Sequence, residues 1–94
     1  MSIPVETFYI FAIALALFGT AFAALGMSNE RAYWSQRDPS GDPRKEATPF
    51  ATVIAKAPMY AAGEYRAPLR VAAIGVIMWY LAIAAAVIGF LISL

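Results

Sequence analysis

Two apolar runs without a charged residue constrain the fold of this chain more than any other feature. The first covers residues 8–27, and the second covers residues 71–94, which read VAAIGVIMWYLAIAAAVIGFLISL. At a rise of 1.5 Å per residue, about 20 helical residues cross the roughly 30 Å hydrocarbon core of a bilayer. Each run is therefore long enough for a transmembrane helix, the second with some tilt. We expect an all-α membrane protein, folded as an antiparallel hairpin of two transmembrane helices.

The first run is expected to be a permanent helix rather than a cleaved signal peptide. Residues 1–7 contain no Lys or Arg and one acid, Glu6, whereas a signal peptide begins with basic residues and has a shorter apolar core. With 62% hydrophobic and 14% charged residues, the chain is also too apolar for a soluble domain. We expect lipid to be its main solvent.

The charged residues are concentrated in the segment that connects the two runs. Twelve of the thirteen charged side chains lie within residues 30–70, including all seven Lys and Arg. Short loops rich in Lys and Arg stay on the cytoplasmic side of a membrane, or on the matrix or stromal side of an organelle. We therefore expect the loop, residues 28–70, on that side of a bacterial inner membrane or its organelle equivalent, and both termini on the other. Side chains expected to anchor the boundary are Arg31, Trp34, Arg66 and Arg70.

One segment of the loop has the pattern of a short amphipathic helix, at about residues 49–57. Pro49 suits the first helical position, and Pro58 is expected to stop the helix. One face combines i, i+3, i+4 and i+7 positions, namely Phe50, Val53, Ile54 and Ala57. This helix is expected on the membrane surface or on a partner protein; packing against the ends of the chain's own spans is an equally good alternative. Before it, two Asp-Pro steps around Ser40 predict exposed coil.

The residue types needed for several kinds of chemistry are missing. The chain has no Cys and no His, which excludes disulfides, thiolate or imidazole metal sites and histidine-ligated haem or chlorophyll within this chain. Neither apolar run contains the carboxylate that a proton-carrying hairpin needs. The loop acids have basic neighbours, as Glu64 has Arg66, which indicates solvated mixed charge rather than acid-base catalysis. We expect no enzyme activity, no metal, no cofactor of its own and no nucleic-acid partner.

Small residues recur at heptad spacing in both runs, which favours close packing of one helix on the other. They are Ala12, Ala16, Gly19, Ala23 and Gly26 in the first run, and Ala72, Gly75, Ala82, Ala86, Gly89 and Ser93 in the second. Membrane helices associate where small side chains let their backbones approach closely. The runs are rich in Ala, so a stripe of this kind also arises by chance. Large side chains would then point outward, namely Phe8, Phe11, Leu15, Phe18 and Phe22 in the first run and Ile77, Leu81, Ile88 and Leu91 in the second.

Trp79 and Tyr80 lie deeper in the second run than aromatic residues of a membrane helix usually do. They follow Arg70 by nine and ten residues, about 14 Å, which is near the middle of the bilayer. Their N–H and O–H groups need acceptors there. The candidate contacts are another subunit or a bound pigment, quinone or lipid at a shared interface; bonding to carbonyls of the first run is the alternative. The lone Thr20 is expected to bond back to its own helix.

The pattern is that of a scaffold rather than of a reactive protein. We expect a non-catalytic accessory subunit that stabilises or assembles a larger integral membrane complex, in contact with membrane lipids. Respiratory and photosynthetic electron-transport complexes are the first candidates, by analogy. Two alternatives stay open: a small regulator or assembly factor of a transporter or enzyme, and a self-assembling holin-like pore, which the lack of a charged tail disfavours.

Overall fold

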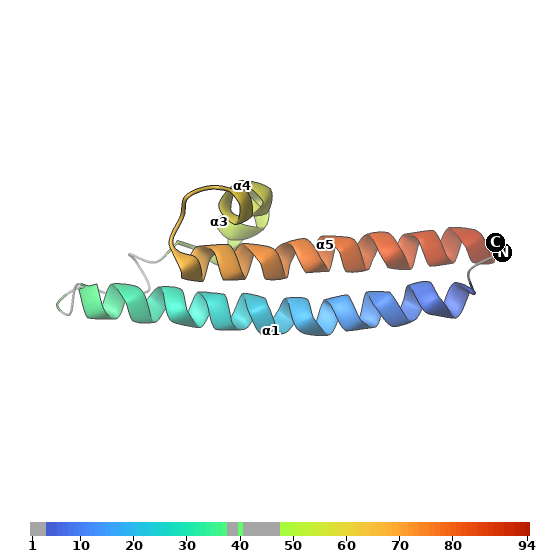
Figure 1. The fold of residues 1–94 in the computed structure, drawn as a ribbon, viewed down its shortest axis with the longest axis horizontal. Helices are drawn as coiled ribbons and strands as arrows, with labels where there is room; N and C mark the ends of the chain where they lie inside the picture. The colour runs from blue at the N-terminus through green and yellow to red at the C-terminus, as the bar shows by residue number, and fades with distance from the viewer. Residues whose placement is uncertain (1–3, 38–39, 41–47) are drawn as a thin grey trace.

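The computed structural model describes residues 4–37, 40 and 48–94, and these residues form four helices and no strand (Figure 1). In chain order they are α1 (Val5–Arg37), α3 (Phe50–Ala55), α4 (Ala57–Ala62) and α5 (Ala67–Ser93). The expected all-α class is confirmed. The coil expected around the two Asp-Pro steps lies outside the described residues, apart from Ser40 in a turn.

The two long helices, α1 and α5, lie side by side and run in opposite directions (Figure 1). The start of α1 and the end of α5 therefore lie at the same end of the molecule. Helix α1 has 33 residues and is about 50 Å long, and α5 has 27 residues and is about 40 Å long. Both helices are long and apolar enough to cross a membrane.

Helix α1 continues ten residues beyond the apolar run that predicted it. No Gly or Pro interrupts residues 28–37, and the next proline in the sequence is Pro39. Side chains four residues apart also bond along this extension, since Trp34 donates to Glu30 at 2.7 Å and Arg37 donates to the Tyr33 hydroxyl at 3.0 Å. Residues 28–37, expected to belong to the loop because the apolar residues end at Met27, are therefore part of α1.

Small residues let α1 and α5 pack with their backbones nearly in contact. A Cβ atom added to Gly19 would lie 2.7 Å from the carbonyl oxygen of Gly75, and one added to Gly26 would lie 2.7 Å from the Cα of Ala72. Most residues of the two predicted stripes are buried: Gly19, Ala23, Gly26, Ala72, Gly75, Ala82 and Gly89. Ala12, Ala16 and Ala86 are half-buried. The small-residue faces of α1 and α5 are thus turned toward each other; we call this contact the seam.

The segment between the long helices forms two short helices that cross the first half of α5. Helix α3 ends at Ala55, before the proline that was expected to stop it, and Pro58 then lies in the first turn of a second helix, α4. A proline there lacks only an N–H that would be free anyway, which is why it starts a helix as readily as it ends one.

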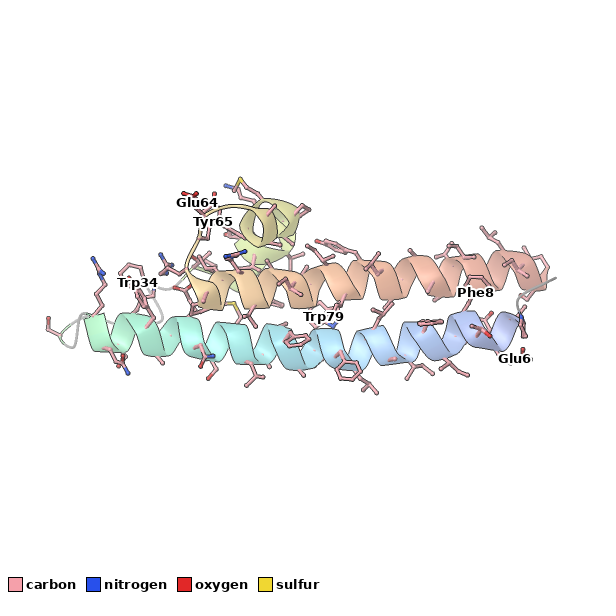
Figure 2. All side chains as sticks on the ribbon, viewed as in Figure 1. Glu6, Phe8, Trp34, Glu64, Tyr65 and Trp79 are labelled. Carbon is pink, nitrogen blue, oxygen red and sulfur yellow. The ribbon has the colours of Figure 1, made fainter. Side chains whose placement is uncertain are left out.

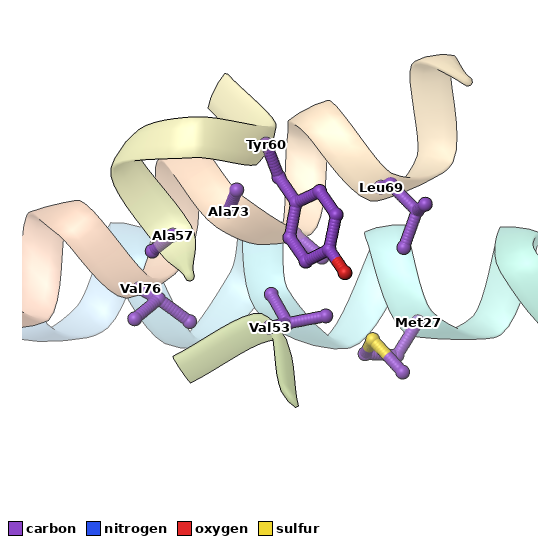
Figure 3. Close-up of a cluster of buried hydrophobic side chains, with 8 residues drawn as sticks. Met27, Val53, Ala57, Tyr60, Leu69, Ala73 and Val76 are labelled. Atoms are coloured by element: carbon purple, nitrogen blue, oxygen red, sulfur yellow. The ribbon is translucent and has the colours of Figure 1, made fainter. Parts of the chain in front are cut away.

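A small hydrophobic core holds α3 and α4 against the long helices. Val53 of α3 and Ala57 and Tyr60 of α4 pack on Leu69, Ala72, Ala73 and Val76 of α5 and on Met27 of α1 (Figure 3). Of the predicted amphipathic face, Val53 and Ala57 are buried, Phe50 is partly buried, and Ile54 is 37% exposed. Helix α5 then begins at Ala67, four residues before the second apolar run, with Pro68 in its first turn.

Candidate functional site

A partly buried ion pair joins the C-terminal part of α1 to the start of α5. The Arg66 guanidinium donates to Oε1 of Glu30 from Nη2 at 2.7 Å and from Nε at 3.2 Å, and Trp34 Nε1 donates to the same oxygen at 2.7 Å. Glu30 has no solvent exposure, whereas the Arg66 side chain is 32% exposed. We call Glu30, Trp34 and Arg66, together with Tyr33, the clasp.

Two aromatic rings complete the surroundings of the Arg66 cation. The guanidinium carbon lies 5.1 Å from the centre of the Tyr33 ring and 5.0 Å from the centre of the Trp34 ring. Both distances are in the range where the face of an aromatic ring attracts a cation. A buried carboxylate is stable only when it is paired and hydrogen-bonded, and the clasp supplies both conditions from its own side chains.

One atom of the clasp has no partner. Oε2 of Glu30 is buried, and no donor of the described residues reaches it. A buried acceptor without a hydrogen bond costs free energy, and this cost reduces the net stabilisation that the clasp gives to the contact between α1 and α5.

The clasp changes the roles of residues that the sequence analysis treated as surface charges. Arg66 pairs with Glu30, 36 positions away, and not with its near neighbour Glu64, which is exposed in the α4–α5 connection (Figure 2). Of the four expected membrane anchors, Trp34 and Arg66 belong to the clasp, while Arg31 and Arg70 are exposed. The spacing of Glu30 and Trp34 by one helical turn was the sequence signal for their contact; nothing comparable marked Glu30 and Arg66.

Trp79 and Tyr80 find their hydrogen-bond acceptors within the chain. Trp79 lies between α5 and α1 (Figure 2), and its Nε1 donates to Oγ1 of Thr20 at 3.1 Å. Thr20 in turn donates to the carbonyl of Ala16 at 2.8 Å, so the expected bond to its own helix is confirmed. The Tyr80 hydroxyl donates to the carbonyl of Ile54. That carbonyl lies in the last turn of α3, where carbonyls lack partners within the helix.

Beside Trp79 a shallow groove opens between α1, α3 and α5, with a volume of about 340 Å³. It is lined by Thr20, Ala23, Ala24, Met27, Arg31, Phe50 and Trp79, and we call this set the groove. Phe50 and Trp79 meet edge to face, with their ring centres 5.7 Å apart. Arg31 is the charged residue of the lining, and its side chain is exposed.

On α1, large aromatic side chains stand away from α5. Phe11, Phe18 and Phe22 are separated by seven and four residues, which places them on one face, and all three are exposed. We call these three residues the aromatic ridge. At 100° per residue, the aromatic ridge and the groove residues that belong to α1 lie on opposite sides of this helix, and the seam lies between these two sides.

The described part of the chain has no group of three His, Cys, Asp or Glu residues that could hold a metal ion. No protein-family description, curated protein or solved structure matches the chain. The function must therefore be inferred from the clasp, the groove, the aromatic ridge and the long apolar helices.

Proposed function

We propose that the chain is a two-span membrane hairpin that serves as a non-catalytic accessory subunit of a larger membrane complex. The observation that carries this proposal is that its polar groups bond within the chain, while its exposed surface is largely apolar. Polar side chains deep in the long helices, such as Thr20, Trp79 and Tyr80, bond to the chain itself, while the large apolar side chains of α1 face outward. Such a hairpin can contact a neighbouring protein through exposed apolar side chains, without supplying a reactive group to it.

The membrane boundary is proposed at the level of the clasp. Between Glu6 and Glu30, α1 carries no charged residue over about 34 Å, enough to cross the roughly 30 Å hydrocarbon core. The antiparallel arrangement brings Glu30 level with Arg66, so that all Lys and Arg residues of both helices lie toward one end, and Glu6 is the one charged residue of α1 at the other. Arg31 and Arg70 extend from this level toward the headgroups. The concentration of Lys and Arg at this end supports an orientation with this end on the cytoplasmic side.

Helices α3 and α4 then lie within the cytoplasmic leaflet, against α5, with α3 reaching the depth of Trp79 and Tyr80. This placement is supported by their apolar outer surface, which includes the exposed side chains of Ile54 and Met59. Lys56 is the one charged residue of residues 48–63, and it is exposed at the junction of α3 and α4, where its long side chain can extend to the headgroups. The bond from Tyr80 to Ile54 satisfies a carbonyl that lipid cannot satisfy.

The aromatic ridge is the surface proposed to contact the core of the complex. Aromatic side chains bury a large area in a membrane contact with few rotatable bonds, and their seven- and four-residue spacing suits a neighbouring helix. We look first among respiratory and photosynthetic electron-transport complexes, because small hairpins without cofactor ligands are common there. This choice of complex rests on analogy.

The proposal is tested by extracting the tagged chain from its native membrane in mild detergent, followed by native electrophoresis and mass spectrometry. Stoichiometric recovery in one large particle is expected. Phe18→Ala on the aromatic ridge should reduce that recovery, and Leu17→Ala, equally exposed but on another face of α1, should not.

Three outcomes would overturn the proposal. Migration alone or as a small homo-oligomer would exclude a stable subunit. Recovery in substoichiometric amounts, with the chain easily removed from the particle by detergent, would indicate a regulator or assembly factor. Dye leakage from vesicles that contain only this chain would indicate a pore.

A further inference from the structure

The groove has the length and the polarity of a site for one lipid chain. Thr20 at one end and Arg31 at the other are eleven residues apart on α1, about 16 Å along the helix. Half of a 30 Å hydrocarbon core is about 15 Å, so the groove covers the depth of one leaflet. Its cationic end lies next to Glu30 of the clasp, and its apolar end lies next to Trp79.

The deep end of the groove suits hydrocarbon better than a polar ring. Its two polar groups, the Thr20 hydroxyl and the Trp79 N–H, are already engaged with each other, and the Thr20 hydroxyl donates to the Ala16 carbonyl. A quinone or pigment head would find no free donor there among the described lining residues. The remaining surface comes from alanines of α1, from Met27 and from two aromatic rings, which a flexible acyl chain can follow.

The outer end of the groove suits an anion. Arg31 is exposed. Among the described residues it forms no ion pair, and the groove lining contains no acid. A guanidinium presents a planar set of donors that matches two phosphate oxygens at once. At a membrane surface the same charge attracts anionic lipids.

We propose that the groove binds one phospholipid with an anionic headgroup, its acyl chain lying along Ala24, Met27 and Phe50 and its phosphate bound by Arg31. This site lies on the side of α1 opposite the aromatic ridge. It requires the hairpin to be in a membrane, but it does not require the complex proposed above.

The test is native mass spectrometry of the purified full chain in detergent, with phosphatidylglycerol or phosphatidylcholine of identical acyl chains added. We expect a one-to-one adduct that favours phosphatidylglycerol. Arg31→Gln should lower the preference for phosphatidylglycerol by about tenfold, because the lost cation attracts a headgroup with a net negative charge more strongly than one whose phosphate is balanced by choline. Arg70→Gln is the matched control: Arg70 is also exposed at the start of α5 but does not line the groove.

A second pair of variants tests the acyl part of the site. Ala24→Leu fills the groove and should abolish the adduct with both lipids, whereas Ala21→Leu, exposed on another face of α1, should leave it unchanged. Both alanines are outside the seam, so circular dichroism should show equal helix content for the two variants.

The proposal would be overturned if Arg31→Gln kept the full lipid preference, or if Ala24→Leu kept the adduct. Competition by soluble glycerol phosphate at equal concentration would also overturn it, because a phosphate site would then suffice without an acyl chain. In the native membrane, a photo-crosslinking residue introduced as Phe50→p-benzoylphenylalanine, which replaces one aromatic side chain of the groove lining by another, should label lipid. Labelling of a protein, either a partner or a second copy, would show that the groove is a protein interface.

Discussion

Glu30 has no solvent exposure, and its Oε1 accepts bonds from two side chains on different elements. Replacing it by Gln preserves its volume but removes the charge that Arg66 balances. We expect Glu30→Gln to lower the free energy of unfolding by about 1–3 kcal/mol, the range for a buried polar group that loses its partner. Arg66 is about one-third exposed, so water screens part of the loss and the upper end is not expected. Unfolding by SDS titration, followed by circular dichroism, measures the difference.

Glu64→Gln is the control for the clasp, since Glu64 is exposed and should change stability by less than about 0.5 kcal/mol. The double variant Glu30→Gln with Arg66→Gln should cost less than the sum of the two single variants, because the two residues act as one unit. Strict additivity would contradict the clasp.

At the scale of elements, the seam depends on glycines that no larger residue can replace. A Cβ at position 75 would lie 2.6 Å from the carbonyl oxygen of Gly19, a backbone atom that cannot move away alone. In an isolated helix, Gly→Ala is stabilising by about 1 kcal/mol. We expect Gly75→Ala to be destabilising instead, by about 1–3 kcal/mol, since overpacking must push α1 and α5 apart. The same SDS titration gives the sign, and the sign alone decides between a close seam and two loosely associated helices.

Ala84→Val, on an exposed face of α5, adds volume away from the seam and serves as the comparison. It should change the stability little. An equal loss of unfolding free energy in both variants would mean that added volume is destabilising anywhere on α5, and that the seam has no special role.

How far the sequence predicts this molecule depends on the range of the interaction concerned. The helical class and the small-residue faces of α1 and α5 follow from local composition and period, and Gly19 and Gly75 are accordingly buried where expected. The clasp depends on the register between two helices. A slip of one turn would move Glu30 by 5.4 Å relative to Arg66, and periodicity alone does not fix that choice. The break between α3 and α4 was missed for another reason: Pro58 can start a helix as well as end one.

At the scale of the whole molecule, the proposed membrane hairpin predicts that its two ends are exposed on opposite sides of the bilayer. The chain has no Cys, so single cysteines can be introduced without a background signal. Ser35→Cys, beyond the clasp on α1, should react with a membrane-impermeant maleimide only from the cytoplasmic side. Ser93→Cys, at the end of α5, should react only from the opposite side. Labelling of both from one side would contradict a hairpin that crosses the bilayer, and reversed labelling would contradict the orientation.

The depth of the hairpin in the bilayer decides whether α3 and α4 lie among lipid chains or above them. Trp34→Phe leaves Trp79 as the single tryptophan, and Trp79→Phe leaves Trp34. With the boundary at the clasp, Thr20 lies ten residues, or about 15 Å, inside Glu30, and Trp79 bonds to Thr20. Bromine atoms near the ends of lipid chains should therefore quench the fluorescence of Trp79 most strongly. Trp34 should respond only to bromine close to the headgroups. Because Phe50 packs against Trp79, strong quenching of Trp79 by shallow bromine would move α3 and α4 into the headgroup layer together with it. Arg31, about 16 Å further out along α1 than Thr20, would then lie beyond the lipid phosphates and could not bind the headgroup of the proposed lipid.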